Sequence, residues 1–255
     1  MVSHKNDIQS MYIRNLTTGY VKNNAQKIIS ARLNLTAHRG QLIMLMGPNG
    51  CGKSTLMRTI IGEQKPLDGA VLFDDISVKD LSISARSRLI SIVLTGNLGS
   101  DALRVGEIVE MGRYPYTGFR GKLDEQDVAI VQKALARCGL AKFVDRHLSE
   151  LSDGEKQRSM IARALAQETP VMLLDEPTAH LDIPNRVSVC AMLRDLVHAE
   201  ERKIIVMSTH ELDLAKKYAD RIWLMDRKGV MHTGTPAELD EQGLFRTVFS
   251  AAAIL

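Results

Sequence analysis

A glycine-rich segment directly after an apolar run constrains the fold of this 255-residue chain more than any other feature. The run Leu42 to Met46 has the length of a strand, and Gly47-Pro48-Asn49-Gly50-Cys51-Gly52-Lys53-Ser54 follows it. This segment fits G-x-x-x-x-G-K-[ST], in which glycines let successive backbone N–H groups surround phosphate oxygens. A helix-like stretch from Lys53 to Ile61 comes next and would add its N-terminal partial charge. The order strand, loop, helix predicts an α/β phosphate-binding unit.

The side chains at the end of the loop have separate expected roles. Lys53 can reach the β- and γ-phosphates of a nucleotide as a point charge, and the Ser54 hydroxyl can bind Mg²⁺. Thr55 can add a further phosphate contact, whereas Cys51 is interpreted as a small filler of the loop. A plain turn between strand and helix would require none of these residue types, so nucleotide binding is the favoured interpretation.

A second apolar run, Val171 to Leu174, ends in the carboxylates Asp175 and Glu176. Asp175 can hold Mg²⁺ indirectly opposite Ser54. Glu176 points differently because strand side chains alternate, which suits a general base for the water that attacks the γ-phosphate. Without the glycine loop, such a pair would more often be a surface turn.

Composition excludes several classes of protein. The net charge of +3, with no run of five like charges, argues against a dedicated nucleic-acid binder. No apolar run approaches the roughly 18 residues of a membrane span, and the start lacks a secretory signal. The cysteines Cys51, Cys138 and Cys190 form no C-x-x-C pair, so neither a zinc site nor a disulfide framework is indicated. We therefore predict a cytoplasmic protein.

The rest of the chain divides into a part with strand patterns and a part with helix patterns. The first forty residues predict short strands at Met11 to Leu16 and Ile28 to Thr36, with turns at Gly19 and at Asn23-Asn24. Helix patterns instead dominate from about Gly96 to Arg158. The other predicted elements are a buried strand at Ile204 to Met207, a helix at Asn185 to Glu200, and a helix through Val128, Val131, Leu135 and Cys138 that Gly139 stops.

The segment Leu151-Ser152-Asp153-Gly154-Glu155 resembles the L-S-G-G-E/Q signature of ABC-type ATPases, with Asp153 in place of the first glycine. The resemblance spans nearly the whole chain. It implies one domain, 1–255: a P-loop NTPase (RecA-like) α/β core with an N-terminal antiparallel β subdomain at 1–95 and 159–255, and an inserted helical subdomain at 96–158. In the family, residues at the positions of Ser152 and the Gly154 N–H contact the γ-phosphate of ATP that is bound to the P-loop of another subunit. From the residues alone, Ser152 to Glu155 is a capping box, and both interpretations can hold.

Further family elements follow in the expected order. The resemblance places Tyr20 where an aromatic stacks on adenine, and His210 where a histidine contacts the γ-phosphate. Ala179-His180-Leu181-Asp182 is similar to the loop that couples two sites across a dimer. Thr95 stands where the family has a glutamine that meets Mg²⁺ or water and moves with the transporter. Its shorter hydroxyl would act on Mg²⁺ through an additional water or leave the ion with one protein contact fewer, and Asn97 is a candidate substitute. Taken alone, Tyr20 would be an ordinary strand tyrosine and His210 a structural histidine.

A single cassette with no coiled-coil arm and no fused span looks like the ATP-hydrolysing subunit of a bacterial importer. Met111-Gly112-Arg113-Tyr114-Pro115-Tyr116 resembles the G-R-x-P segment of ATPases that serve iron-siderophore, haem and vitamin B12 (cobalamin) uptake. The implied partners are a second copy in the ATP-bound state, membrane-spanning permease subunits on the inner face of the cytoplasmic membrane and, through them, a substrate-binding protein. The alternatives are an ABC subunit for another cargo, a soluble ABC ATPase acting on nucleic acid or ribosomes, a P-loop small-molecule kinase and a non-hydrolysing regulatory cassette.

Overall fold

The computed structural model describes residues 8–23, 25–94, 102–118, 121–199 and 202–250. Its central sheet has six strands in the order β10-β9-β3-β8-β7-β6, all parallel except β10. These strands are β3 (Gln41–Met46), β6 (Ile90–Val93), β7 (Val171–Leu174), β8 (Ile204–Ser208), β9 (Arg221–Met225) and β10 (Met231–Gly234). The predicted buried strands before the glycine loop and before Asp175-Glu176 are thus confirmed as β3 and β7.

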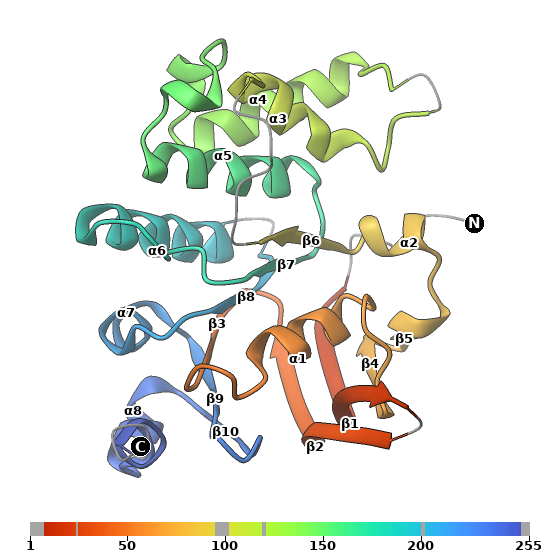
Figure 1. Ribbon diagram of the computed structural model, residues 1–255. Helices are drawn as coiled ribbons and strands as arrows, with labels where there is room; N and C mark the ends of the chain where they lie inside the picture. Colours follow the sequence, from red (N-terminus) through yellow and green to blue (C-terminus); the bar gives the residue numbers. More distant parts are fainter. Residues whose placement is uncertain (1–7, 24, 95–101, 119–120, 200–201, 251–255) are drawn as a thin grey trace.

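A separate antiparallel sheet in the order β2-β1-β4-β5 forms the N-terminal part of the chain. It contains β1 (Ser10–Lys22), β2 (Ala25–His38), β4 (Asp68–Phe73) and β5 (Ile76–Ser77). In Figure 1, β1 and β2 lie at the bottom of the molecule. The expected α/β core with an antiparallel β subdomain is confirmed.

The prediction of a turn at Gly19 is wrong, because β1 continues through this residue to Lys22. Gly19 pairs with Ile28 across the hairpin, and a Cβ atom built on it would lie 2.2 Å from the backbone oxygen of Lys27. The glycine therefore permits close approach of two strands and does not reverse the chain. The turn prediction at Asn23 is correct, with its φ at 51°, whereas Asn24 lies outside the described residues.

Helices cover the sheets and form a layer of their own. They are α1 (Lys53–Ile60), α2 (Ile83–Ser87), α3 (Val105–Glu110), α4 (Glu125–Arg137), α5 (Asp153–Ala166), α6 (Ile183–His198), α7 (Leu212–Tyr218), α8 (Pro236–Glu241), α9 (Leu244–Ser250) and the short 3₁₀ turns Val78–Asp80, η2 (Met111–Arg113), Ala141–Phe143 and Leu148–Glu150. The helices α3, α4 and α5 pack together at the top of Figure 1, far from β1 and β2. Because α5 runs unbroken from Asp153 to Ala166, the expected boundary at residue 158 falls inside a helix.

The two faces of the central sheet belong to different cores. Alternate residues of β3 point to opposite sides: Leu42, Met44 and Met46 pack with α3 to α6, whereas Ile43 and Leu45 pack with β1, β2 and α1. Burial on both faces explains why the strand is a continuous apolar run. No helix in the described part of the chain combines the length and apolarity needed to cross a membrane.

Candidate functional site

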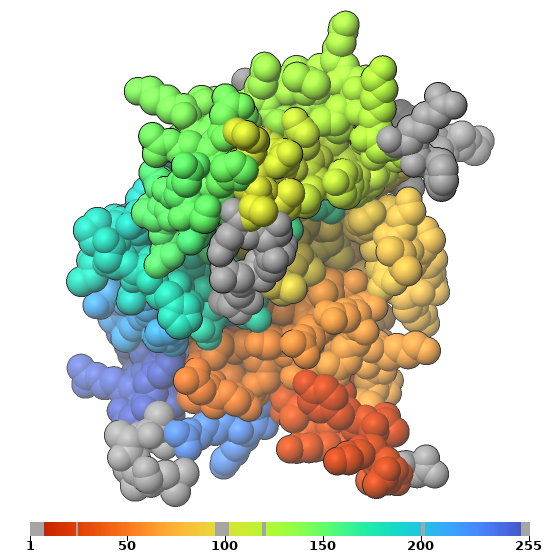
Figure 2. All heavy atoms as spheres, turned by 45° about the horizontal axis from the view of Figure 1, so that its top comes forward, coloured from red at the N-terminus to blue at the C-terminus, as the bar shows by residue number. Residues whose placement is uncertain are grey.

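The predicted catalytic residues gather at the carboxyl ends of three neighbouring strands. The order β3-β8-β7 in the sheet places the 47–54 loop, His210 and the Asp175-Glu176 pair at one edge, because the three strands are parallel. Figure 2 shows the orange part of the chain, which includes α1, at the surface between the red N-terminal strands and the green helical layer. This edge is where a doubly covered parallel sheet holds its ligand.

Two glycines of the loop allow the backbone to curl where side chains would clash. Gly47 has φ 152°, and a Cβ atom on it would lie 2.3 Å from the carbonyl oxygen of Met225. Gly52 has φ 119°, and a Cβ atom on it would lie 2.5 Å from Ile29. The loop leads directly into α1 at Lys53. The N–H groups of the first helical turn, which have no partner within the helix, therefore lie next to the loop. The strand, loop and helix predicted from the motif are confirmed.

Lys53 is enclosed by its own loop. Its Nζ donates hydrogen bonds to the carbonyl oxygens of Gly47 (2.8 Å) and Pro48 (3.4 Å), and the residue is 7% exposed. Both acceptors are neutral carbonyl oxygens, so neither of these two bonds is an ion pair that would compete with an incoming phosphate. The loop thereby holds the cation in place before any ligand arrives.

The hydroxyl groups that follow Lys53 reach two different neighbours. The Thr55 hydroxyl is 2.9 Å from the hydroxyl of Tyr20, so the adenine-stacking candidate lies beside the start of α1, with 44% of its surface exposed. Ser54 lines a cavity of about 150 Å³ together with Asp175. The structure therefore brings together two of the three residues predicted to hold Mg²⁺, and the third, Thr95, lies outside the described residues.

Cys51 is buried within the loop, where burial raises the pKa of its thiol. A thiol with a raised pKa is a weaker nucleophile at neutral pH. Its sulfur lies 2.8 Å from the position that a Cβ atom on Gly47 would occupy. The filler role expected for this side chain agrees with this packing.

Ser208, which the sequence analysis did not select, links the two acidic residues. Its buried hydroxyl donates a 2.6 Å hydrogen bond to Oδ1 of Asp175 and accepts a 2.7 Å hydrogen bond from the backbone N–H of Glu176. Glu176 has a left-handed backbone with φ 44°. The serine therefore holds both the carboxylate of one residue and the strained backbone of the next. Its position as the last residue of β8, beside β7, is the signal that could have identified it.

We expect Ser208→Ala to lower the rate of ATP hydrolysis about tenfold, with a smaller change in the KM for ATP. The lost bond joins a hydroxyl to a carboxylate, and bonds of this kind contribute about 1.5–3 kcal/mol. Steady-state phosphate release across a range of ATP concentrations measures both constants. Ser159→Ala is the matched control, since Ser159 is another buried serine whose hydroxyl binds the carbonyl oxygen of Glu155 within α5. Equal rates for both variants would contradict the assigned role of Ser208.

Two further loops at this edge are tied to each other through Glu211, which follows His210. Glu211 accepts hydrogen bonds from Thr178 Oγ1 and from Arg186 Nη1, both at 3.0 Å. Arg186 also donates to the carbonyl oxygen of Leu181 at 2.6 Å. Glu211 therefore connects the segment that follows the exposed His210 to the 179–182 loop. No motif in the sequence marks Glu211 and Arg186 for this role.

The exposed carboxylate of Asp182 already has a structural task. It accepts a 3.0 Å hydrogen bond from the N–H of Asn185 and so caps the N-terminus of α6. The predicted contact of Asp182 with nucleotide across a dimer is not tested within a single chain and stays a prediction.

The capping box expected at Ser152 is confirmed. Ser152 is the N-cap of α5, and its backbone N–H and hydroxyl each donate to Glu155 Oε2 at 2.8 Å. The hydrogen bond from the Ser152 N–H, and then that from its hydroxyl, lowers the pKa of Glu155. A Cβ atom on Gly154 would lie 2.4 Å from Asn185 in α6, so this end of α5 packs closely on the core.

The contact of Ser152 and Gly154 with a second subunit's ATP stays a prediction. Thr95 and Asn97 lie outside the described residues.

Comparison with known proteins agrees with this geometry. A family profile described as "ABC transporter" matches residues 31–179. The petrobactin import ATP-binding protein FpuD of Bacillus anthracis is 36% identical, over 94% of this chain and 86% of the relative. The iron(3+)-hydroxamate import ATP-binding protein FhuC of Bacillus subtilis (strain 168) is 30% identical, over 96% and 90%. A dimeric post-hydrolysis structure of the ATP-binding cassette MJ0796, bound to ADP and Pi, matches with a TM-score of 0.75 and 27% identity, over 89% of this chain and 98% of that one.

Proposed function

Because this chain belongs to the ABC transporter family of ATPases, we propose that two copies of it power the import of an iron chelate through membrane-spanning permease subunits. The observation that carries the proposal is the meeting of the Lys53 loop, the Asp175-Glu176 pair and His210 at one edge of a parallel sheet. The Ser152-Gly154 start of α5, which a P-loop small-molecule kinase does not require, favours the ABC-type function over that alternative.

Each residue at the edge has a role that follows from its position. Lys53 and the N–H groups at the start of α1 bind the β- and γ-phosphates of ATP, and Tyr20 stacks on the adenine. Glu176 accepts a proton from the attacking water, while His210 contacts the γ-phosphate. Ser208 keeps Asp175 and Glu176 in register through its two hydrogen bonds.

Mg²⁺ fits this site, because Ser54 and Asp175 line one cavity and offer hydroxyl and carboxylate oxygens. Ser54 would hold the ion directly and Asp175 through water. When bound, the ion neutralises charge on the phosphate oxygens. The hydrogen bond from Ser208 leaves one carboxylate oxygen of Asp175 for this purpose.

Two copies pair so that each ATP lies between the Lys53 loop of one and the Ser152-Gly154 loop of the other. The N-terminus of α5 is suited to a phosphate, since its N–H groups and dipole attract negative charge. The dimeric form of the cassette MJ0796 supports this arrangement. ATP joins the copies, and hydrolysis removes the γ-phosphate contacts that hold them together.

The import role and its cargo rest on relatives and on one segment of sequence. The two relatives named above import petrobactin and iron(3+)-hydroxamate, and Arg113 to Pro115 resembles the corresponding segment of siderophore, haem and cobalamin ATPases. We therefore assign an iron chelate as the cargo class. The protein would act on the inner face of the cytoplasmic membrane, bound to its permease, and a substrate-binding protein would deliver the chelate on the other side.

Removal of this gene from its source organism is expected to abolish uptake of at least one iron chelate. Uptake of ⁵⁵Fe-labelled petrobactin, a ⁵⁵Fe-labelled hydroxamate and labelled cobalamin is measured in the deletion strain. The same strain then receives a plasmid copy of the wild type or of Lys53→Met. Loss of uptake that only the wild type restores supports the proposal. Unchanged uptake of all three compounds contradicts the assignment of cargo.

A further inference from the structure

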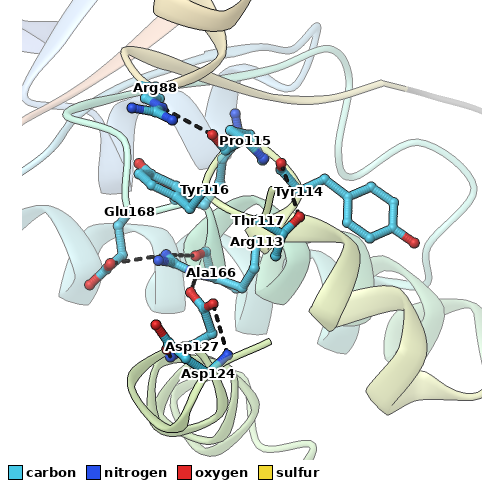
Figure 3. Close-up of polar contacts among 11 residues, drawn as sticks. Arg88, Arg113, Tyr114, Pro115, Tyr116, Thr117, Asp124, Asp127, Ala166 and Glu168 are labelled. Carbon is cyan, nitrogen blue, oxygen red and sulfur yellow. Dashed lines mark hydrogen bonds and ion pairs between the residues drawn. The ribbon is translucent and has the colours of Figure 1, made fainter. Parts of the chain in front are cut away.

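The end of α5 opposite Ser152 is capped by the 111–117 segment, which includes η2. Arg113 Nη1 donates a 2.7 Å hydrogen bond to the carbonyl oxygen of Ala166, and the Tyr116 hydroxyl donates a 2.9 Å bond to that of Gln167. The last carbonyl groups of a helix have no partner within the helix and carry partial negative charge. A cation and a hydroxyl group from one distant segment therefore close the C-terminus of α5. Figure 3 shows the contact between Arg113 and Ala166.

Arg113 is the buried centre of this cap. It is 5% exposed, and its Nε binds Asp127 Oδ1 at 2.8 Å while its Nη1 binds Glu168 Oε2 at 3.0 Å. The guanidinium carbon also lies 4.2 Å from the centre of the Tyr116 ring. Asp127 is itself fixed, because it forms the capping box of α4 with Asp124. One guanidinium thus joins η2, the start of α4 and the end of α5.

The same cap is fastened to the core. The side-chain amide of Gln167 donates to the carbonyl oxygens of Ser87 and Ile90, at the end of α2 and the start of β6. Arg88 Nε donates to the carbonyl oxygen of Pro115 at 3.0 Å. A Cβ atom on Gly112 would lie 2.2 Å from the carbonyl oxygen of Arg163, so η2 packs directly on α5. The C-terminal end of α5 is therefore a fixed point.

We propose that Arg113 is a positioning residue which sets the direction of α5 and so places the Ser152-Gly154 loop for contact with the ATP of a second copy. Helix α5 has 14 residues, a length of about 21 Å at 1.5 Å per residue. A small rotation at its fixed end therefore moves the Ser152 end by a larger distance. This inference rests on the proposed role of Ser152 across a dimer.

Tyr114 is exposed although its two neighbours in the chain are held in place. It is 59% exposed, yet it lies between Arg113 and Pro115, whose side chain and carbonyl group are both held. In Figure 3 its ring points away from the buried cluster. The exposed ring therefore belongs to the residue next to the guanidinium that caps α5.

The test measures ATP-dependent dimerisation of the purified protein in a Glu176→Gln background, by sedimentation velocity. Arg113→Met/Asp127→Asn removes the cation without leaving a buried carboxylate unpaired, and asparagine can still cap α4. We expect the dissociation constant of the dimer to rise at least tenfold, while the affinity of the monomer for a fluorescent ATP analogue changes less than about twofold. Arg113→Lys should give an intermediate value, since one ammonium cannot reproduce the forked contacts of a guanidinium.

Two further variants separate this inference from others. Leu239→Ala removes a buried side chain of α8 and controls for a general loss of stability; we expect it to leave dimerisation unchanged. Ser152→Ala tests the proposed function itself. If Ser152→Ala weakens the dimer but both Arg113 variants match the background, the positioning role is overturned and the proposed function stands. If no variant affects dimerisation, or if the Glu176→Gln protein forms no dimer with ATP, both are overturned.

Discussion

Glu176→Gln is expected to lower phosphate release by about 10²- to 10³-fold while ATP stays bound. Glutamine has the same size as glutamate but cannot accept a proton from water. The backbone at this position is held by the Ser208 hydroxyl and by the end of β7, so the substituted side chain should occupy the same place. The expected result is a protein that binds ATP normally and cannot finish the reaction.

Three measurements distinguish this outcome from misfolding. Phosphate release should fall, the affinity for ATP should not, and sedimentation with ATP should show a dimer that the wild type populates only briefly. Glu241→Gln, an exposed carboxylate at the end of α8, provides the control and should hydrolyse ATP at the wild-type rate. Hydrolysis by Glu176→Gln at an undiminished rate would mean that another group activates the water.

The parts of this site that the sequence predicts are those in which the chemistry is local. The glycines of the loop, Lys53 and Ser54 are neighbours along the chain, and their spacing alone defines a phosphate cradle. Asp175 and Glu176 were identified in the same way, from a buried strand that ends in carboxylates. These segments fold as expected because strand, turn and helix each follow from the residues within them.

The parts that the sequence does not predict depend on which strands become neighbours. Ser208 acts on Asp175 only because β8 lies beside β7, although 33 residues separate the two side chains. Gly19 has the composition of a turn but lies in a strand, because its partner strand approaches too closely for a side chain. The Arg113 cap on α5 joins residues 53 positions apart. No local pattern specifies such pairings.

Thr95 departs from the family's glutamine and lies outside the described part of the structure. The coupling between hydrolysis and the partner is therefore better addressed through the described residues Arg113 and Tyr114, which connect the exposed surface to α5.

Lys53→Met is expected to reduce the rate of ATP hydrolysis by about 10²- to 10³-fold, as loss of a fixed charge that faces the developing negative charge does in other enzymes. Unlike Glu176→Gln, it should also weaken ATP binding, because the lysine contacts the phosphates of the bound nucleotide. Methionine retains the length and the apolar stem of the side chain but has no charge.

The same substitution is expected to have the opposite effect on the stability of the nucleotide-free protein. In the absence of nucleotide, Lys53 is a buried cation whose acceptors are two neutral carbonyl groups, so its burial is poorly compensated. Lys53→Met should therefore leave the thermal midpoint of the nucleotide-free protein unchanged or raise it. ATP at about 100 times its Kd stabilises a protein by about 2.7 kcal/mol, and this increment should disappear in the variant. Thermal unfolding with and without ATP measures both effects, with the exposed Lys79→Met as control. A variant that is destabilised without nucleotide, yet still gains stability from ATP, would show that Lys53 stabilises the fold of the loop and does not bind the nucleotide.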